Sequence, residues 1–282
     1  MIIFPCCKIN LGLNVVGVRP NGYHDIETVF FPVPLCDTLE IVEMDEQFPS
    51  LTACDLKVTG NAVDCDEQNN LVVKAYQLMR ASFKVPRVHI HLFKNIPSQA
   101  GMGGGSADAA YTLRLLNHQF KVGLSVEELR MMAVKLGADC PFFISNEAAY
   151  ATGIGEELTP LERINGKSLL SGYWLGIVKP NICVSTAEAY AGVAVEKPQK
   201  NCRTIVYQDI SSWRKELTNS FEPSVYARYP RLGEIKKRLY DMGAIYAQMS
   251  GSGSAHFGIF YNEPKELTEQ FPSDFTYSCK LE

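Results

Sequence analysis

The sequence predicts an α+β protein built from two domains. Its 282 residues are long for a single domain and fit two domains of about 150 residues each. A hydrophobic fraction of 46% and a charged fraction of 21% are typical of a globular chain with a sizeable core. Segments with strand and helix periodicity intermingle along the chain without a regular βαβ alternation. Turn-forming and acidic residues cluster at 153–160, so we expect the domains to be residues 1–155 and 156–282.

The first strand is predicted over residues 7–15, where apolar and polar side chains alternate. Its apolar face includes Ile9, and its polar face carries Lys8 and Asn10. A turn follows at residues 19–22, because Pro, Asn and Gly favour turns. The other elements expected in the first half of the chain are strands at 28–33, 38–44 and 88–93 and a helix at 70–82.

The helix predicted over residues 125–136 has a clear local start signal. Ser125 stands at the N-cap position and Glu128 follows three residues later, which is the pattern of a capping box. Gly137 is expected to end this helix. Beyond it we expect a strand-like run at 142–144, a strand at 173–178, an exposed loop at 196–203, helices at 224–229 and 231–242, and a strand at 256–261.

The most informative stretch is the glycine-rich segment after the strand at 88–93. Glycines at positions 101, 103, 104 and 105 allow positive φ and let a ligand approach the backbone amides. Ser106 is expected to cap the alanine-rich helix that follows, and Asp108 to lie in its first turn, where it favours the helix dipole. The unpaired N–H groups at such a helix start bind anions, above all phosphate. Strand, glycine loop and helix therefore predict a phosphate-binding site.

Two familiar phosphate-binding loops do not fit this segment. The Walker pattern requires Gly-Lys-Ser/Thr, and no lysine follows Gly105. The dinucleotide fingerprint requires a third glycine where Ser106 stands, which also argues against a dinucleotide oxidoreductase. A connector whose glycines serve only turn geometry is the structural alternative.

Charge and cysteine content argue against other classes of protein. The net charge is −4 and no strongly basic tract is present, so we expect no nucleic-acid partner. The apolar residues 1–7 have no positive flank before them and are soon interrupted by Lys8, so we expect neither a signal peptide nor a membrane span. The nine cysteines show no Cys-x-x-Cys spacing and predict reduced thiols that serve as packing residues in the cytoplasm.

Three segments together resemble the GHMP kinases, the superfamily of galactokinase, homoserine kinase, mevalonate kinase and phosphomevalonate kinase. They read Lys8-Ile-Asn-Leu-Gly-Leu13, Pro97-x-x-x-Gly-Met-Gly-Gly-Gly-Ser106 and Met249-Ser-Gly-Ser-Gly-Ser254. Two more segments, Arg19-Pro-Asn-Gly-Tyr-His24 and Gly137-Ala-Asp-Cys-Pro141, are similar to one branch of this superfamily. Members of that branch phosphorylate the 2-hydroxyl of 4-diphosphocytidyl-2-C-methyl-D-erythritol in non-mevalonate isoprenoid biosynthesis. The resemblance covers most of the chain.

The resemblance implies an N-terminal domain of ribosomal-protein-S5-like fold, a C-terminal ferredoxin-like domain and a site in the cleft between them. It implies an ATP-dependent kinase that uses Mg²⁺. No acidic cluster in the sequence makes a dedicated metal cage, which suits an ion carried mainly by the nucleotide phosphates. The segment 250–254 is implied to close the cleft beside these phosphates. We expect a monomer or a homodimer. The nucleotide-binding residues implied by the resemblance are Pro97, Gly101, Met102, Gly103, Gly104, Gly105, Ser106 and Ala107.

Two catalytic residues are implied by the same resemblance. Lys8 would stabilise charge during phosphoryl transfer, and Asp139 would take the proton from the acceptor hydroxyl. Asn10, on the same face as Lys8, is implied to contact the substrate. Structural alternatives stay open from the residues alone, because a strand lysine is commonly solvated and a turn aspartate commonly bonds nearby amides.

The substrate implied by the resemblance is a small molecule with a cytidine diphosphate group. Tyr23 and His24 would frame its cytosine ring, because aromatic faces stack on bases. Thr186 and Tyr190 are also implied to contact the substrate, with Tyr190 on the opposite side of the base. Packing beneath a hairpin is the alternative for the Tyr-His pair. The alternative functions are a kinase for another small alcohol, such as homoserine or mevalonate, and a catalytically silent member that binds a small molecule.

Overall fold

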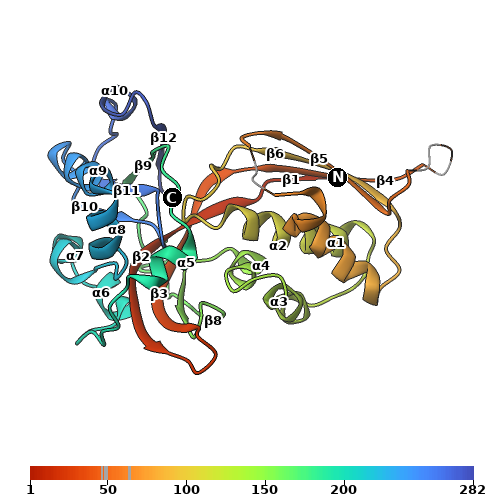
Figure 1. The fold of residues 1–282 in the computed structure, drawn as a ribbon, viewed down its shortest axis with the longest axis horizontal. Helices are drawn as coiled ribbons and strands as arrows, with labels where there is room; N and C mark the ends of the chain where they lie inside the picture. The colour runs from red at the N-terminus through yellow and green to blue at the C-terminus, as the bar shows by residue number, and fades with distance from the viewer. Residues whose placement is uncertain (46, 48–49, 63–64) are drawn as a thin grey trace. The chain divides into compact units, whose positions relative to one another are not determined.

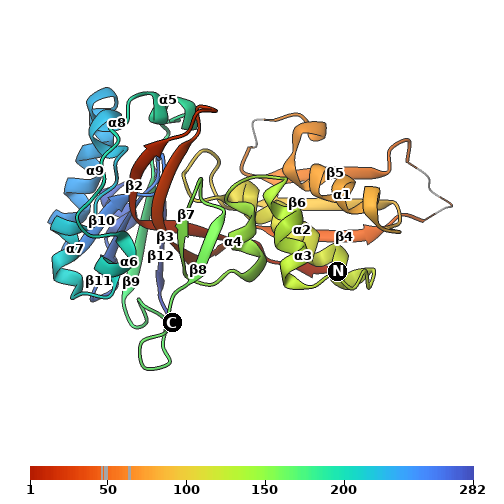
Figure 2. The ribbon, with the colours of Figure 1, turned by 90° about the horizontal axis from the view of Figure 1, so that it is seen from below.

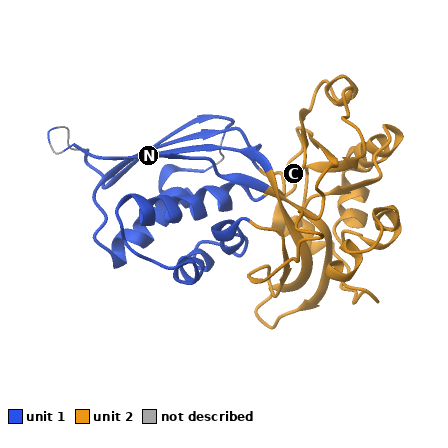
Figure 3. Ribbon diagram, turned by 180° about the vertical axis from the view of Figure 1, so that it is seen from behind, with its two compact units in different colours: residues 1–7, 34–98, 103–146 blue, residues 8–33, 99–102, 147–282 orange. Residues whose placement is uncertain are grey.

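The structure is a computed structural model that describes residues 1–45, 47, 50–62 and 65–282. The chain forms two compact units (Figure 3). Unit 1 comprises residues 1–7, 34–98 and 103–146, and unit 2 comprises residues 8–33, 99–102 and 147–282. Both units combine helices with sheets, which confirms the predicted α+β class. The units do not follow chain order, because residues 8–33 and 99–102 pack with the C-terminal half.

Unit 1 is built on a four-stranded sheet with the order β1-β4-β6-β5. The inner strand β6 (Val88–Lys94) is antiparallel to β4 (Thr38–Glu43) and parallel to β5 (Cys54–Gly60), and β1 (Ile2–Ile3) pairs with β4. Residues of β6 are alternately buried and exposed, so one face of this strand is covered. Helices α1 (Leu71–Ser82) and α2 (Gly104–Gln119) pack together on one face of the sheet (Figure 1 and Figure 2). Unit 1 also contains η1 (Glu67–Asn69), α3 (Val126–Val134) and α4 (Cys140–Ser145).

Unit 2 carries two four-stranded sheets, apart from the ends of β2 and β3 that are counted with unit 1. One sheet has the order β2-β3-β7-β8, with β2 (Cys6–Val18), β3 (His24–Cys36), β7 (Ala149–Thr152) and β8 (Glu157–Pro160). The other is antiparallel and has the order β10-β11-β9-β12, with β9 (Trp174–Lys179), β10 (Tyr246–Met249), β11 (His256–Phe260) and β12 (Phe275–Lys280).

Apolar residues of both sheets share a core in unit 2. Leu13 and Val15 of β2 pack in one buried cluster with Ala247 and Met249 of β10 and with the helices α8 (Glu222–Arg228) and α9 (Pro230–Asp241). Other helices of unit 2 are α5 (Thr186–Ala191), α6 (Cys202–Val206), α7 (Ile210–Glu216) and α10 (Leu267–Gln270). In the described part of the chain, no helix has the length and apolar character needed to cross a membrane.

The strongest local predictions are confirmed. The helix predicted at 70–82 is α1, and the Asn70 side chain caps it by accepting a hydrogen bond at 2.9 Å from the backbone of the first turn. The helix predicted at 125–136 is α3, where Ser125 and Glu128 form the expected capping box. These helix starts depend on contacts a few residues apart, which a sequence pattern records directly.

Two local predictions are wrong. Residues 142–144 lie in helix α4 rather than in a strand, because Pro141 in the first turn suits a helix start. The exposed loop predicted at 196–203 does not reach residue 203. Asn201 caps helix α6 there, and the Cys202 side chain that follows is fully buried.

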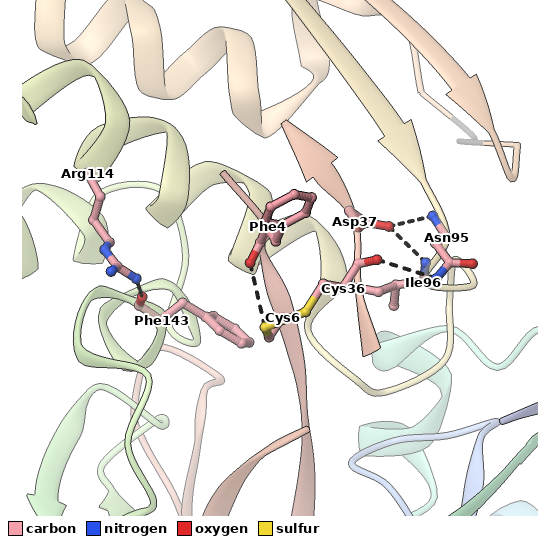
Figure 4. Close-up of a disulfide and its surroundings, with 8 residues drawn as sticks. All are labelled: Phe4, Cys6, Cys36, Asp37, Asn95, Ile96, Arg114 and Phe143. Atoms are coloured by element: carbon pink, nitrogen blue, oxygen red, sulfur yellow. Dashed lines mark hydrogen bonds between the residues drawn. A yellow bond between two sulfur atoms is a disulfide. The ribbon is translucent and has the colours of Figure 1, made fainter. Parts of the chain in front are cut away.

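The cysteines also depart from the prediction that all nine are reduced packing residues. Cys6 and Cys36 are joined by a disulfide at the ends of β2 and β3 (Figure 4). Cys65 and Cys183 are exposed and so do not serve as packing residues. The spacing of cysteines could not reveal the bonded pair, because 30 residues separate them. Their proximity depends on which residues of two strands lie opposite each other.

His256, at the start of β11, gives unit 2 a pH-dependent stability. The side chain is fully buried, with Nδ1 3.0 Å from the Ser254 carbonyl oxygen and Nε2 2.8 Å from the Tyr226 hydroxyl. Burial disfavours the charged ring and lowers the pKa of His256 to about 3. The unfolded chain takes up this proton near pH 6.5, at about the ordinary histidine pKa. The stabilisation is therefore complete above that pH and is lost as the pH falls toward 3.

We expect the substitution His256→Gln to flatten the pH dependence of the free energy of unfolding measured in urea. Between about pH 6 and pH 4 the unsubstituted protein should lose about 1.4 kcal/mol per pH unit more than the variant. The same substitution at the exposed His118, His118→Gln, is the control for loss of a histidine ring at the surface. Parallel curves for the unsubstituted protein and His256→Gln would contradict a neutral, buried His256.

Candidate active site

The later part of the glycine-rich segment forms the start of helix α2. Gly103 occupies the N-cap position with a left-handed φ of 69° and ψ of 21°, which glycine adopts without strain. Gly104, Gly105 and Ser106 are the first three helical residues, and N–H groups at these positions have no acceptor within the helix. The prediction that Ser106 caps the helix is wrong, because the turn at Gly103 starts the helix earlier. This helix start supplies backbone donors for a phosphate group.

The earlier part of the segment, residues 99–102, packs in unit 2 with two segments distant in sequence. The backbone N–H of Lys8 donates to the Met102 carbonyl at 3.0 Å. The Ser250 hydroxyl donates to the Gly101 carbonyl at 2.9 Å. Gly101 has a φ of +71°, and a Cβ added there would overlap the Ser250 carbonyl oxygen, so this contact requires glycine. Within unit 2, Gly101 and Met102 therefore contact two of the other motif segments of the sequence, 8–13 and 249–254.

Lys8 and Asn10 lie buried on β2 rather than solvated. Lys8 is 3% exposed, and its Nζ donates to Asn10 Oδ1 at 2.5 Å. Asn10 Nδ2 donates to the Thr28 hydroxyl at 3.0 Å, and this hydroxyl donates to the Gly12 carbonyl. The Lys8 ammonium also lies 4.7 Å from the centre of the Phe30 ring. These contacts fix both side chains before any substrate binds.

Asp139 immediately precedes helix α4 in unit 1 and is partly exposed. Its backbone is helical, with φ −80° and ψ −18°, whereas a capping aspartate usually has extended backbone. The next residue, Cys140, donates its N–H to the Gly137 carbonyl at 3.1 Å, and its thiol is hydrogen bonded to the Ser106 side chain. Burial raises the pKa of Cys140 to about 12, so this thiol stays protonated near neutral pH. The turn that carries Asp139 is thereby tied to the first turn of α2.

Two of the aromatic residues predicted to bind a base, His24 and Tyr190, lie together in unit 2. The rings of His24 and Tyr190 are in contact, with centroids 4.8 Å apart and planes inclined by 32°. Tyr190 also packs edge-on against Phe221 at 4.8 Å. Tyr23 is 59% exposed, and Thr186 is exposed at the start of α5. Because His24 and Tyr190 touch, a base can enter between them only if one of the rings moves.

A cavity of about 310 Å³ lies in unit 1 beside the strand that leads into the glycine loop. Its size is at the lower end of the range for small-molecule sites. Asn61 in its wall donates to the carbonyls of Lys94 and Asn95, both at 2.8 Å, and the Ser98 hydroxyl donates to the Ala62 carbonyl at 2.9 Å. The cavity could not be predicted from sequence patterns, because its wall combines residues of β5, the following loop and the start of α1. The residues that line it are Leu56, Val58, Thr59, Gly60, Asn61, Ala62, Cys65, Glu67 and Asn70.

Asp108 was predicted to lie in the first turn of α2, and this prediction is wrong. It is the fifth residue of the helix and is 3% exposed. Its Oδ2 accepts a hydrogen bond at 2.7 Å from Nζ of Lys94, at the end of β6. The earlier helix start at Gly103 explains the difference. Asp108 therefore belongs to a buried ion pair rather than to a surface dipole interaction.

Within the described ranges, the structure contains no group of three or more His, Cys, Asp or Glu side chains arranged to hold a metal ion. At the start of α2, the hydroxyl of Ser106 in the third helical position is a side-chain oxygen donor. A single hydroxyl suits Mg²⁺, which keeps several waters and takes most other ligands from nucleotide phosphates.

Two family models match this chain. The model described as "GHMP kinases N terminal domain" matches residues 70–147, and the model described as "GHMP kinases C terminal" matches residues 199–276. A Bacteroides fragilis protein named 4-diphosphocytidyl-2-C-methyl-D-erythritol kinase is 45% identical over 281 residues, which cover 100% of both chains. A protein of the same name from Azobacteroides pseudotrichonymphae is 47% identical over 261 residues, 92% of this chain and 93% of its own.

A solved structure is similar over the same extent. A crystal structure of 4-(cytidine 5′-diphospho)-2C-methyl-D-erythritol kinase matches with a TM-score of 0.81 and 29% sequence identity. The match covers 99% of this chain and 98% of that chain. The similarity therefore includes every segment described above.

Proposed function

The chain belongs to the GHMP kinase family, and we propose that it transfers the γ-phosphate of ATP to the 2-hydroxyl of 4-diphosphocytidyl-2-C-methyl-D-erythritol. One observation carries the proposal beyond the family. Residues 101 and 102 of the glycine loop are bonded to the segment with Ser250 and to the segment with Lys8, which are both distant from the loop in sequence. A phosphate-binding loop held next to a fixed lysine is what phosphoryl transfer requires, because the reaction depends on positioning and charge stabilisation.

The N–H groups of Gly104, Gly105 and Ser106 are the proposed donors to the phosphates of ATP. The 310 Å³ cavity in unit 1 is the proposed site of the adenine ring. Its wall is bonded to residues 94–98, which lead directly into the glycine loop. Mg²⁺, when bound, would neutralise charge on the phosphates, and the Ser106 hydroxyl is the proposed protein ligand.

Asp139 is the proposed general base. Its carboxylate would accept the proton of the acceptor hydroxyl as the oxygen attacks the γ-phosphorus, and ADP would leave with the electrons of the broken bond. Lys8 would stabilise the negative charge on the transferred group and orient the hydroxyl. Its hydrogen bond to Asn10 Oδ1 fixes the position of the ammonium. Asn10 is the proposed substrate contact beside it.

The cytidine diphosphate group is proposed to bind through Tyr23, His24, Thr186 and Tyr190. His24 and Tyr190 already form an aromatic pair on which a base can stack. This aromatic pair favours a nucleotide-linked alcohol over homoserine or mevalonate, which have no base.

We propose the family domains as residues 1–155 and 156–282, since the matched ranges 70–147 and 199–276 fall on either side of that boundary. We also propose that the protein is cytoplasmic and that it is a monomer or a homodimer.

We expect His24→Ala to raise the KM for the cytidyl alcohol by about 10-fold or more, because base stacking is worth about 1–3 kcal/mol. The KM for ATP should change less than about 2-fold, because His24 is not among the residues proposed to bind ATP. Steady-state kinetics with each substrate varied in turn measure both values. Tyr261→Ala removes an exposed aromatic of unit 2 and should change neither KM. Equal increases for both substrates of the His24 variant would contradict base recognition.

An assay of ATP consumption against a panel of alcohols tests the proposed function. The panel contains 4-diphosphocytidyl-2-C-methyl-D-erythritol, homoserine and mevalonate, and ³¹P NMR identifies the phosphorylated position. We expect turnover with the cytidyl compound and a new phosphate ester at its 2-hydroxyl. Preference for homoserine or mevalonate would assign a different substrate, and no turnover with any alcohol would point to a silent binding protein.

A further inference from the structure

Three charged side chains form a buried cluster in unit 1 that the mechanism above does not use. Lys94 ends β6, Asp37 connects β3 to β4, and Asp108 lies in the second turn of α2. They are 5%, 0% and 3% exposed. Lys94 Nζ donates to Asp108 Oδ2 at 2.7 Å and also to Asp37 Oδ2. Buried charges are costly even when paired, so stability alone does not explain this cluster.

Asp37 fixes the direction in which the chain leaves β6. Its Oδ1 accepts hydrogen bonds from the N–H of Asn95 at 2.6 Å and from the N–H of Ile96 at 2.8 Å (Figure 4). The Asn95 side chain donates to the carbonyl of Cys36, the residue before Asp37, at 3.4 Å. Pro97 and the glycine loop follow at once. One carboxylate thus sets the entry into the loop.

Lys94 joins this entry to the exit of the loop. A Cβ added to Gly104, the first residue of α2, would lie 3.5 Å from Lys94 Nζ and 3.0 Å from Cγ2 of Ile96. The ammonium therefore lies close beneath the helix start. Its partner Asp108 belongs to that helix, whereas its partner Asp37 holds the strand end. A single lysine thus bridges the two ends of the glycine loop through two carboxylates.

We propose that Asp37, Lys94 and Asp108 are positioning residues that hold the two ends of the glycine loop at the separation needed to bind the ATP phosphates. The inference rests on the proposed function. Two carboxylates flank the Lys94 ammonium, so its effect on phosphate is exerted through backbone geometry rather than by direct attraction. Displacement of a binding group by about 1 Å can reduce activity by about 100-fold. Loss of these positioning contacts should therefore have a large effect on nucleotide binding.

The substitutions Asp108→Leu and Asp108→Asn test the proposal as a pair. Leucine has a similar branched shape but gives Lys94 no acceptor, whereas asparagine retains an acceptor oxygen. Binding of the non-hydrolysable analogue AMP-PNP is measured by calorimetry, and KM is measured for both substrates. We expect Asp108→Leu to weaken AMP-PNP binding and raise the KM for ATP by about 10-fold or more. The KM for the cytidyl alcohol should stay within about 2-fold, and Asp108→Asn should restore most of the nucleotide affinity.

Leu116→Ala is the matched control, because Leu116 is buried in the same helix about 18 Å beyond Gly104. It should lower thermal stability without changing the KM for ATP. If Asp108→Leu does not fold, Lys94→Arg keeps the charges balanced, and its longer, planar group should raise the KM for ATP by about 5-fold.

Three outcomes are distinguishable. Unchanged AMP-PNP binding in Asp108→Leu, or in Lys94→Arg where it replaces the leucine variant, would overturn the positioning role while leaving the kinase function intact. Equal rises in both KM values would also overturn it, because they would indicate general disruption of the fold. Failure of the unsubstituted protein to bind AMP-PNP would instead refute the proposed function on which the inference rests.

Discussion

Asp139→Asn is expected to lower kcat by about 1,000-fold while ATP binding stays nearly unchanged. Asparagine keeps the size of the side chain but cannot accept the proton of the acceptor hydroxyl. General acid–base groups contribute about 10²–10⁴-fold to rate, so loss of the proposed base should have an effect of this order. The backbone turn should survive, because the bonds from Cys140 to Gly137 and Ser106 do not involve the Asp139 carboxylate. Single-turnover kinetics and calorimetry with AMP-PNP measure the two properties separately.

Asp209→Asn provides the control for this substitution. Asp209 also precedes a helix, and its side chain caps α7 by accepting a hydrogen bond from the Ser211 N–H at 2.9 Å. Asparagine is an equally good cap, so activity should change less than about 2-fold. Turnover by Asp139→Asn at the rate of the unsubstituted protein would remove Asp139 as the base.

Lys8→Met is expected to lower kcat by at least about 100-fold. Methionine retains most of the length of the lysine stem and its packing, but it removes the charge that is proposed to stabilise the transferred phosphoryl group. Loss of one preorganised electrostatic contact commonly reduces kcat by about 10²–10³-fold. The KM for ATP should change much less, because the proposed phosphate donors are backbone groups of Gly104, Gly105 and Ser106.

Lys179→Met is the matched control for the loss of a buried lysine in unit 2. Lys179 is 8% exposed, and its ammonium donates to the carbonyls of Pro180 at 2.8 Å and Ile182 at 3.1 Å. This variant should lose stability but keep kcat in the folded protein. A similar kcat for the Lys8 and Lys179 variants would mean that Lys8 serves structure alone.

Features that depend on neighbouring residues could be predicted from the sequence. The capping box of Ser125 and Glu128 involves residues three apart, and the alternation in β6 repeats every second residue. The glycine loop was recognisable for the same reason, since its four glycines and the alanine-rich helix are contiguous. Even there the exact helix start was missed, because only the backbone geometry of Gly103 reveals the cap.

Features that depend on tertiary packing could not be predicted. The alternation of β2 placed Lys8 and Asn10 on its polar face, but β2 is buried on both faces, so Lys8 is enclosed rather than exposed. Lys94 and Asp37 are 57 residues apart and meet only when β6 and the start of β4 lie side by side. No local sequence pattern indicates a contact between residues so far apart, so the charged cluster beneath the glycine loop could not be predicted from the sequence.

A crystal structure with AMP-PNP and 4-diphosphocytidyl-2-C-methyl-D-erythritol bound together tests the central claim most directly. We expect the phosphates to accept hydrogen bonds from the N–H groups of residues 104–106. The 2-hydroxyl of the alcohol should lie within hydrogen-bond distance of both Lys8 and Asp139, in line with the γ-phosphorus. Phosphates bound away from the start of α2, or a 2-hydroxyl out of reach of both side chains, would contradict it.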